Sequence, residues 1–392
     1  MKRLLVTANS PGEMAGWVRP VAKAWQQAGA GPVDLLLLPC TFATGQEERV
    51  ARELPGVDRV YRSRDYAKLL WRDGRDYRDG ALLHLGGDLM YSALLSWRWK
   101  LQAWSYLWTR PWWNSAFQGF FTKDDWGVRW LRKRKTPQEK IHLIGDLVLD
   151  SVRQAVPQEP ALSREFQISY LPGSRSVEVQ ALTPLFLEVH HLLSQRFPGL
   201  RGVLHLSPFL PPDELTSLIS VDPDPALGGL KGRREGDFLD DGRGGGLEIA
   251  TADGYERLSR SALALSIPGT KTAEAGYLRT PVVIMTPLNR PEHLPSIGIV
   301  GLLDFLPKGN LIKGRLMLRL KPKIGLLGQP NMLAGRALLP EVLDVVDSLG
   351  LADLVGQQIL EEGLLEGVAQ ELRSLYSWSS TPAQSMVEAI LR

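Results

Sequence analysis

Short apolar runs alternate with segments of helical periodicity along most of the chain, and this alternation limits the possible folds more than any other feature. Runs that are apolar throughout are typical of parallel strands covered by helices on both faces. The repeated strand–helix order therefore predicts an α/β, doubly wound architecture. The predicted strands are Leu4–Ala8, Val33–Pro39, Arg59–Arg62, Ala81–Leu85, Gly119–Thr122, Ile141–Ile144, Gln167–Leu171, Gly202–Leu206, Leu247–Thr251, Leu263–Ile267 and Val282–Thr286.

The strand–helix rhythm restarts near residue 165, which predicts more than one domain. Pro157 and Pro160 lie in a segment of little periodicity that we interpret as a linker. We expect domains at 1–154 and 165–342, with helices from 343 to 392. The segment near 222–246 is glycine-rich and has few large apolar side chains, so we expect a mobile surface loop there, with a ligand-binding loop as the alternative.

Composition and spacing exclude several classes of protein. The single cysteine, Cys40, rules out an internal disulfide, and the six histidines show no metal-binding spacing, so we expect no metal site. A net charge of +3 is too small to indicate nucleic-acid binding. The chain has no run of 18 apolar residues, and Met1–Ala8 resembles a strand more than a signal peptide. We therefore expect a cytoplasmic protein.

Two carboxylates follow predicted strands of the first domain. Gly12 and Glu13 come just after the first strand, and Asp88 follows the run that ends at Leu85. Ligands of open α/β sheets gather at the carboxyl ends of strands, where a carboxylate can act as an acid or a base. The residues alone leave two readings open, because Glu13 also suits a helix N-terminus and Asp88 also suits a turn.

Two turns of the second domain have the composition of phosphate-binding sites. Gly173, Ser174 and Arg175 follow one predicted strand and lead into a helix, whose first N–H groups can bind an anion. Another strand leads into a turn with hydroxyl groups for phosphate oxygens and a carboxylate one turn later for ribose hydroxyls. Its residues are Gly269, Thr270, Thr272 and Glu274. Neither turn is a P-loop or a G-x-G-x-x-G fingerprint.

A third pattern is compositional. Nine of the 12 tryptophans fall between Trp71 and Trp130, and the stretch 98–140 has ten basic residues against three acidic ones. A further stretch, 308–330, is basic and apolar. Such mixtures are typical of a membrane interface, with a buried aromatic core or a single-stranded nucleic-acid platform as alternatives. The residues assigned to a membrane or acceptor surface are Trp108, Arg110, Trp112, Trp113, Lys313, Arg315 and Arg319.

Together these segments resemble the lipid-A-disaccharide synthases, glycosyltransferases of the B fold. The resemblance covers most of the chain, and its pieces occur in the family's order. They are Gly12-Glu13, Ile144-Gly145-Asp146, Leu171-Pro172-Gly173-Ser174-Arg175 with Glu178, Gly269-Thr270 with Glu274, Pro281-Val282-Val283 and Pro330-Asn331-Met332-Leu333-Ala334-Gly335-Arg336.

The resemblance implies two Rossmann-like domains facing a cleft, with C-terminal helices returning to the first domain. It implies a UDP-linked acylated glucosamine as donor, a lipid-linked acylated glucosamine phosphate as acceptor, and no metal or other cofactor. Arg175, Thr270, Glu274 and Asn331 would then hold the nucleotide. Similar proteins can exchange C-terminal elements in a homodimer.

The chain departs from the family on the acceptor side. The first loop has Ala15 and Trp17 where the family usually has Ser and Asp, and Tyr91 stands where a second Asp is expected after Asp88. The donor half therefore matches better than the acceptor half.

These observations predict an inverting glycosyltransferase that moves an N-acetylglucosamine-type sugar from a UDP-sugar to a lipid-linked acceptor at the cytoplasmic membrane face. Asp88 is the first candidate for the base and Glu13 the second. The alternatives are a UDP-sugar epimerase on the same fold and a non-catalytic, membrane-associated protein that binds a UDP-sugar.

Overall fold

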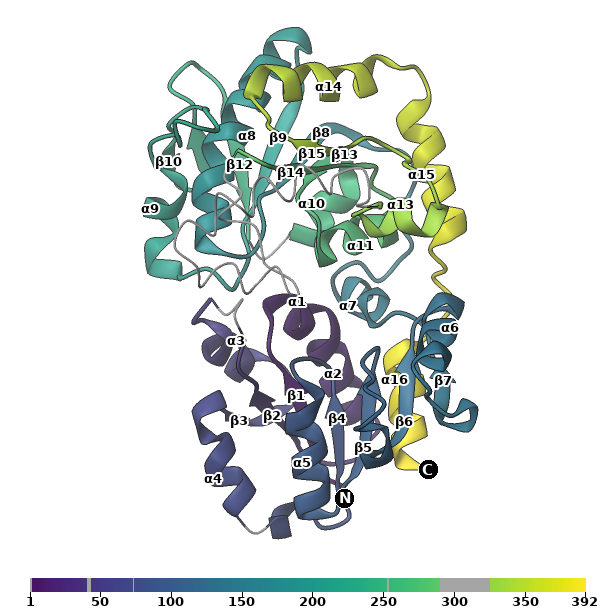
Figure 1. Cartoon of the computed structure of the whole chain (residues 1–392). Coiled ribbons are helices and arrows are strands. Elements are labelled where there is room, and N and C mark those ends of the chain that lie inside the picture. Colours follow the sequence, from purple (N-terminus) through teal and green to yellow (C-terminus); the bar gives the residue numbers. More distant parts are fainter. Residues whose placement is uncertain (1, 41–43, 73, 252–253, 290–324) are drawn as a thin grey trace. The chain divides into compact units, whose positions relative to one another are not determined.

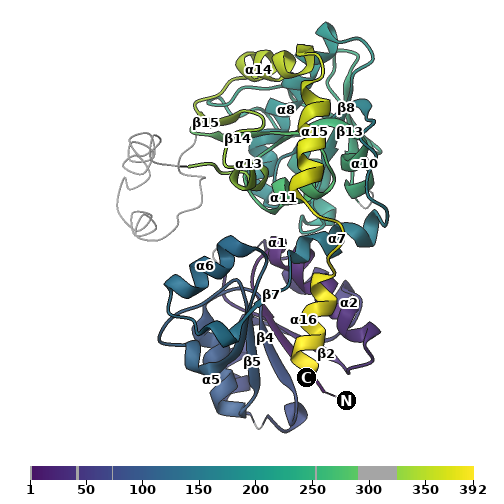
Figure 2. The same ribbon diagram turned by 90° about the vertical axis from the view of Figure 1, so that its right-hand side faces the viewer.

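The computed structural model describes residues 2–40, 44–72, 74–251, 254–289 and 325–392. The chain divides into two compact units (Figures 1 and 2). Unit 1 comprises Met1–Gln154 and Trp378–Arg392, and unit 2 comprises Ala155–Ser377. Each unit is built on one sheet, so the expected α/β architecture with two doubly wound domains is confirmed.

Unit 1 contains a parallel sheet in the order β3-β2-β1-β4-β5-β6-β7. Its strands are β1 (Leu4–Ala8), β2 (Val33–Leu37), β3 (Val57–Tyr61), β4 (Ala81–His84), β5 (Gln102–Tyr106), β6 (Phe117–Thr122) and β7 (Ile141–Leu143). The strands β1, β2 and β4 are buried along their whole length, as continuous apolar runs require. Strand β5 was not predicted, because polar Gln102 and Ser105 interrupt its apolar run.

The helices of unit 1 begin with a continuous helical segment made of α1 (Pro11–Glu13), a π-helix (Met14–Val18) and α2 (Arg19–Gln27). The others are α3 (Glu47–Glu53), α4 (Tyr66–Trp71), α5 (Leu89–Trp99), α6 (Asp125–Lys133), α7 (Leu147–Ala155) and α16 (Pro382–Leu391), with short 3₁₀ turns at Ser63–Asp65, Gly74–Tyr77, Asn114–Ala116 and Gln138–Lys140.

Unit 2 contains a mixed sheet in the order β10-β11-β12-β9-β8-β13-β14-β15. Its strands are β8 (Glu165–Leu171), β9 (Arg201–His205), β10 (Arg233–Glu235), β11 (Phe238–Asp240), β12 (Gly246–Ala250), β13 (Ser261–Ser266), β14 (Val282–Pro287) and β15 (Glu341–Asp344). Its helices are α8 (Ser176–Arg196), α9 (Leu215–Ile219), α10 (Gly254–Arg260), α11 (Thr270–Tyr277), α13 (Gln329–Ala334), α14 (Ser348–Leu360) and α15 (Leu364–Leu375), with a 3₁₀ turn at Pro212–Glu214.

The glycine-rich segment near 222–246 differs from the expected loop. Strands β10 and β11 form there and extend the sheet in antiparallel pairing as far as β12. Leu239 is fully buried, and the Asp241 carboxylate lies 2.8 Å from Nδ1 of His191 on α8. The expectation that this segment lacks regular structure is wrong, because buried leucines and the hydrogen bond between Asp241 and His191 anchor a hairpin that composition does not reveal.

The C-terminal segment also differs in part from the expected run of helices. Residues Glu341–Asp344 form the edge strand β15. Helix α14 packs against α8, and its residues Leu351 and Val355 are buried, so α14 and α15 belong to unit 2. Only α16 returns to unit 1, where it packs against α2 and where the Ala383 N–H donates to Asp150 Oδ2 over 2.6 Å.

No helix in the described part of the chain combines the length and the apolar composition needed to cross a membrane.

Candidate functional site

Each sheet has one position at which the chain changes direction across it. In unit 1 the chain runs from β1 to β2 and β3 on one side and then returns to β4 on the other side of β1. In unit 2 it leaves β8 toward β9 and β12 and returns to β13 on the other side of β8. Ligands of open α/β sheets bind outside the carboxyl ends of the strands at such switch points.

Glu13 lies at the switch point of unit 1. Its Oε2 accepts hydrogen bonds from the backbone N–H groups of Asn9 (2.9 Å) and Ser10 (3.2 Å). Ser10 in turn caps the helix, because its Oγ accepts the Glu13 N–H. Burial nevertheless raises the pKa of Glu13 to about 7, since these two bonds only partly offset the loss of water around the charge. A carboxyl group with such a pKa can exchange a proton near neutral pH.

Gly86 creates the space that the Glu13 carboxyl group occupies. A Cβ placed on Gly86 would lie 1.8 Å from Oε2 and 2.1 Å from Cδ of Glu13. Gly86 follows β4 and Glu13 follows β1, so the contact joins the two strands of the switch point. No larger residue fits at position 86 while Glu13 keeps this position.

We expect Gly86→Ala to lower the unfolding free energy by about 1–3 kcal/mol, because the added methyl group overpacks the Glu13 carboxyl group. Glu13→Ala in the same chain should recover much of this loss by removing the obstructing group. Denaturant unfolding of the two single variants and the double variant measures the coupling. Additive losses would show that Gly86 and Glu13 do not share this space.

Asp88 is placed differently from Glu13. It is the exposed N-cap of α5, and its Oδ1 accepts the Met90 N–H over 2.8 Å. Helix capping therefore occupies one of the two carboxylate oxygens of Asp88. Beneath it, the buried ring of His84 lies within hydrogen-bond distance of Thr7 on β1 and Ser92 on α5. Burial lowers the pKa of His84 to about 3, so this ring is a neutral tie between β1, β4 and α5.

The two expected phosphate turns of unit 2 meet at its switch point. Gly173 follows β8 with φ of +114°, and a Cβ placed on it would lie 2.9 Å from Cδ1 of Ile267, which follows β13. Gly269 lies just beyond Ile267 with φ of +150°, and a Cβ there would meet no atom within 4 Å. The turn at Gly269 therefore leaves open space in front of α11.

The chain's own carboxylate fills the anion position at the start of α8. Oε2 of Glu178 accepts the N–H groups of Ser174 and Arg175, each over 3.2 Å. Oε1 lies 2.6 Å from Nη1 of Arg175. The groups that we expected to bind a diphosphate thus contact a carboxylate of the chain itself, that of Glu178, and their contact with a diphosphate stays a prediction.

Other expected donor-site residues have internal partners. Glu274 is buried, and its Oε2 lies 2.6 Å from Nζ of Lys271. The Thr272 hydroxyl donates to the Gly269 carbonyl and accepts the Gln329 N–H, while Thr270 begins α11. Gly12, in turn, is the middle residue of α1 in unit 1.

Asn331 holds the segment that leads into β15. Its Oδ1 accepts the Leu338 N–H over 2.8 Å, and its Nδ2 donates to the Leu339 carbonyl and to Oε1 of Glu341. Asn331 is buried, and these bonds use both of its amide hydrogens. Asn331 therefore has structural partners within unit 2, and the nucleotide contact implied by the resemblance stays a prediction.

The expected membrane residues fall into two groups. Lys313, Arg315 and Arg319 lie outside the described residues. In unit 1 the loop after β5 exposes Trp108, Arg110 and Trp112, whereas Trp113 packs partly into the core. Trp108 also lines an apolar cavity of about 240 Å³ with Trp126 and Trp130. The tryptophan-rich region thus contributes to the core and to the surface alike.

Sequence reasoning missed the contacts that define both switch points. Gly86 lies two residues before Asp88 in the sequence, but no pattern links it to Glu13, 73 residues earlier. The Ser-x-x-Glu spacing of Ser10 and Glu13 is the signal that could have revealed the capping arrangement. In the described ranges, no group of three His, Cys, Asp or Glu side chains is arranged to hold a metal ion.

The chain is similar in sequence to part of several lipid-A-disaccharide synthases. The one from Bordetella petrii is 30% identical over 145 residues, which cover 36% of this chain and 34% of that protein. The one from Burkholderia pseudomallei is 25% identical over 227 residues, 57% of this chain and 48% of that protein. The matched segments thus span half or less of these relatives. No protein-family model matches the chain.

Solved structures resemble the whole chain in fold. The UDP-GlcNAc 2-epimerase from Neisseria meningitidis, bound to UDP-GlcNAc, has a TM-score of 0.57 and 15% identity, covering 100% of this chain and 99% of its own. MurG from Acinetobacter baumannii has a TM-score of 0.52 and 12% identity, with the same coverage. These similarities show the fold that B-type glycosyltransferases and UDP-GlcNAc 2-epimerases share. The chain is thus similar to lipid-A-disaccharide synthases over part of its sequence and to these solved structures in its overall fold.

Proposed function

We propose that the protein is a metal-independent hexosyltransferase that moves a sugar from a UDP-sugar to a hydroxyl group of a lipid-linked acceptor at the cytoplasmic membrane face. The observation that carries the proposal is the pair of switch points with complementary chemistry. Unit 1 offers a carboxyl group with a pKa of about 7, and unit 2 offers a preformed anion position. An inverting sugar transfer needs both a base and a site for the leaving diphosphate.

In unit 2, the donor's diphosphate takes the place of the Glu178 carboxylate. The Arg175 side chain and the N–H groups of Ser174 and Arg175, which contact Glu178 in the structure, then contact the diphosphate instead. The open turn at Gly269 admits further phosphate oxygens near the Thr270 end of α11. Charge that builds on the leaving UDP is stabilised by these donors.

In unit 1, Glu13 is the base that the structure favours over Asp88. Asp88 is exposed and already caps α5, whereas Glu13 is held by two backbone donors and titrates near neutral pH. Glu13 accepts the proton of the acceptor's hydroxyl group. The oxygen of that hydroxyl group attacks the anomeric carbon of the donor sugar. The bond from that carbon to the diphosphate oxygen breaks, and UDP leaves with the electron pair.

Titration of the protein with UDP by calorimetry, without added metal, tests the donor assignment. We expect Arg175→Ala to weaken UDP binding about 10- to 100-fold, because a charge-assisted contact to the diphosphate is lost. Glu274→Ala should also weaken it if the carboxylate contacts the ribose. Arg201→Ala is the matched control. Arg201 begins β9 and therefore lies at the amino ends of the strands in the same sheet, whereas Arg175 follows the carboxyl end of β8. Equal UDP affinity in the wild type and in Arg175→Ala would contradict the assignment.

A second candidate is a UDP-sugar epimerase. The observation that favours it is the fold, because the Neisseria meningitidis epimerase matches the whole chain with a TM-score of 0.57. Incubation with UDP-N-acetylglucosamine alone separates the two reactions: an epimerase changes the sugar without an acceptor, and a transferase does not. A protein that binds UDP but converts UDP-N-acetylglucosamine neither alone nor together with an acceptor would be a non-catalytic binder.

A further inference from the structure

A basic pocket opens at the edge of unit 1 opposite to Glu13. It has a volume of about 350 Å³ and is lined by Gly74, Arg75, Tyr77, Arg78, Asp79, Arg98, Trp99 and Lys100. Asp79 lies just before β4, and Lys100 just before β5, so the pocket lies at the amino ends of these strands. Glu13 and Asp88 lie at the carboxyl ends of β1 and β4. The proposed sugar transfer therefore does not use this pocket.

The lining of this amino-edge pocket is strongly cationic. Three arginines and Lys100 face one carboxylate, that of Asp79. Within the described ranges, the side chains of Arg78, Arg98 and Lys100 form no salt bridge, and all three residues are exposed. Arg98 and Lys100 lie at the C-terminal end of α5, where cations are generally favoured. Arg75 and Arg78 belong to another segment, so the helix end does not explain their position.

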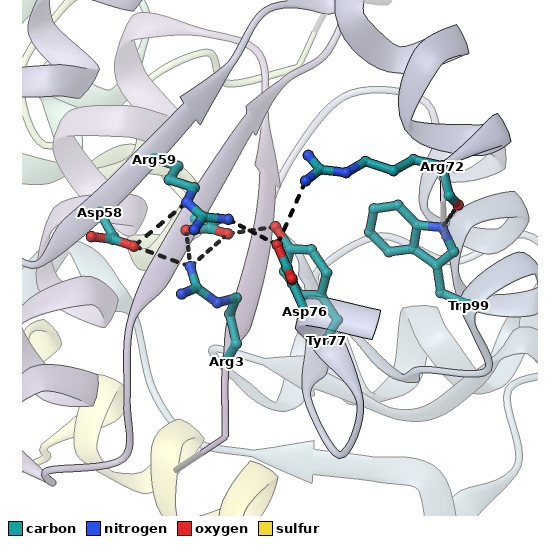
Figure 3. Close-up of polar contacts among 8 residues, drawn as sticks. Arg3, Asp58, Arg59, Arg72, Asp76, Tyr77 and Trp99 are labelled. Carbon is teal, nitrogen blue, oxygen red and sulfur yellow. Dashed lines mark hydrogen bonds and ion pairs between the residues drawn. The ribbon is translucent and has the colours of Figure 1, made fainter. Parts of the chain in front are cut away.

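Two aromatic side chains, Tyr77 and Trp99, form one wall of the pocket. The rings of Tyr77 and Trp99 stack at 4.9 Å with an interplanar angle of 16°. The Tyr77 hydroxyl donates to the buried carboxylate of Asp34 over 2.5 Å, and Nε1 of Trp99 donates to the Arg72 carbonyl over 3.1 Å (Figure 3). The wall is thus anchored to the core, and the pocket is formed before any ligand arrives.

Two residues of the lining have a left-handed backbone. Asp79 has φ of +65° and Lys100 has φ of +54°, where glycine or asparagine is the ordinary choice. Such conformations cost free energy and tend to persist at ligand sites. At position 100 the chain carries a lysine whose ammonium group contributes to the lining charge.

We propose that the amino-edge pocket binds a phosphate-bearing anion. Arginine forks and a lysine are suited to phosphate oxygens, and the charges of Arg78, Arg98 and Lys100 match a group with two or more negative charges. Such a group can belong to a soluble phosphorylated molecule or to the headgroup of an anionic phospholipid. Trp71, whose side chain is 86% exposed next to Arg72, is the residue that distinguishes the two sources.

Calorimetric titration with inorganic pyrophosphate at low ionic strength tests the pocket, with Arg175→Ala as the background so that the proposed donor site does not contribute. We expect Lys100→Asn to weaken binding about tenfold or more. Lys135→Asn is the matched control, because Lys135 also follows a helix end, is exposed and has φ of +61°, but lies outside the pocket. Asparagine suits the left-handed backbone, so neither variant should lower the melting temperature.

Vesicle sedimentation identifies the source of the phosphate group. If phosphatidylglycerol vesicles bind the protein, if pyrophosphate competes, and if Trp71→Ala weakens only the vesicle binding, the ligand is a lipid headgroup. Pyrophosphate binding without vesicle binding indicates a soluble ligand. The proposal is overturned if pyrophosphate does not bind, or if Lys100→Asn and Lys135→Asn weaken its binding equally, since that would be unspecific attraction to a basic surface.

Discussion

Replacing Glu13 by glutamine is expected to lower the rate of UDP formation from a UDP-sugar and a lipid-linked acceptor by about 10²–10⁴-fold, the usual contribution of a general base. Glutamine keeps the size of the side chain and can still accept the Asn9 and Ser10 N–H groups, but it cannot take a proton. The wild-type rate should rise with pH through about 7, where Glu13 ionises, and this limb should be absent in the variant.

Asp88→Asn is the matched control for this prediction. Asparagine caps helices as well as aspartate does, so α5 should stay intact, and the rate should fall far less than in Glu13→Gln. A large loss in Asp88→Asn together with nearly full activity in Glu13→Gln would assign the base to Asp88 instead.

The Glu13→Gln variant also gives a result that needs no substrate. The folded-state pKa of Glu13 is raised from 4.5 to about 7, so the folded protein holds this proton more tightly than the unfolded chain does. The resulting stabilisation is complete below pH 4.5 and is lost as pH rises through 7. Relative to Glu13→Gln, the unfolding free energy of the wild type should therefore fall by about 2–3 kcal/mol between pH 4.5 and 8. A constant difference across this range would show that Glu13 titrates normally.

Asp34→Asn is expected to lower the unfolding free energy of unit 1 by about 3–5 kcal/mol, because it removes the buried charge of the Arg3–Asp34 ion pair. The fully buried Asp34 carboxylate lies 2.8 Å from Nη1 of Arg3 and also accepts the Tyr77 hydroxyl (Figure 3). Burial and the hydrogen bond to Asp34 hold the pKa of Tyr77 well above its usual value, so this phenol remains a donor.

Asp58→Asn is the matched control, because Asp58 pairs with the same nitrogen of Arg3 over 3.0 Å but its side chain is 49% exposed. An exposed pair contributes about 0–1 kcal/mol, so this variant should lose little stability. Urea unfolding followed by tryptophan fluorescence is the measurement, since all 12 tryptophans belong to unit 1. Equal losses in the two variants would show that burial of Asp34 does not set the energy of the pair.

Local sequence signals located most of the secondary structure correctly. The predicted apolar runs coincide with β1 to β4, β6 to β9 and β12 to β14. A strand that is buried on both faces must be apolar along its length, and such runs are easily recognised in a sequence. The same signals failed for β5, β10, β11 and β15, whose polar or glycine-rich sequences depend on neighbouring strands for their hydrogen bonds. Strands of this kind are stabilised by pairing with their neighbours more than by their own composition.

From the amino-acid sequence alone, we predicted two doubly wound α/β units and glycine-containing turns after several of their strands. Those features follow from hydrophobic periodicity and from glycine positions, which are local properties of the chain. Which side chains meet at these turns became clear from the three-dimensional fold. It put Gly86 against Glu13 and filled the α8 anion position with Glu178, and it gave Asn331 structural partners. It also brought together the arginines of the amino-edge pocket. Burial and contacts across the sheet, which set a carboxyl group's pKa and a pocket's charge, depend on residues distant in the sequence.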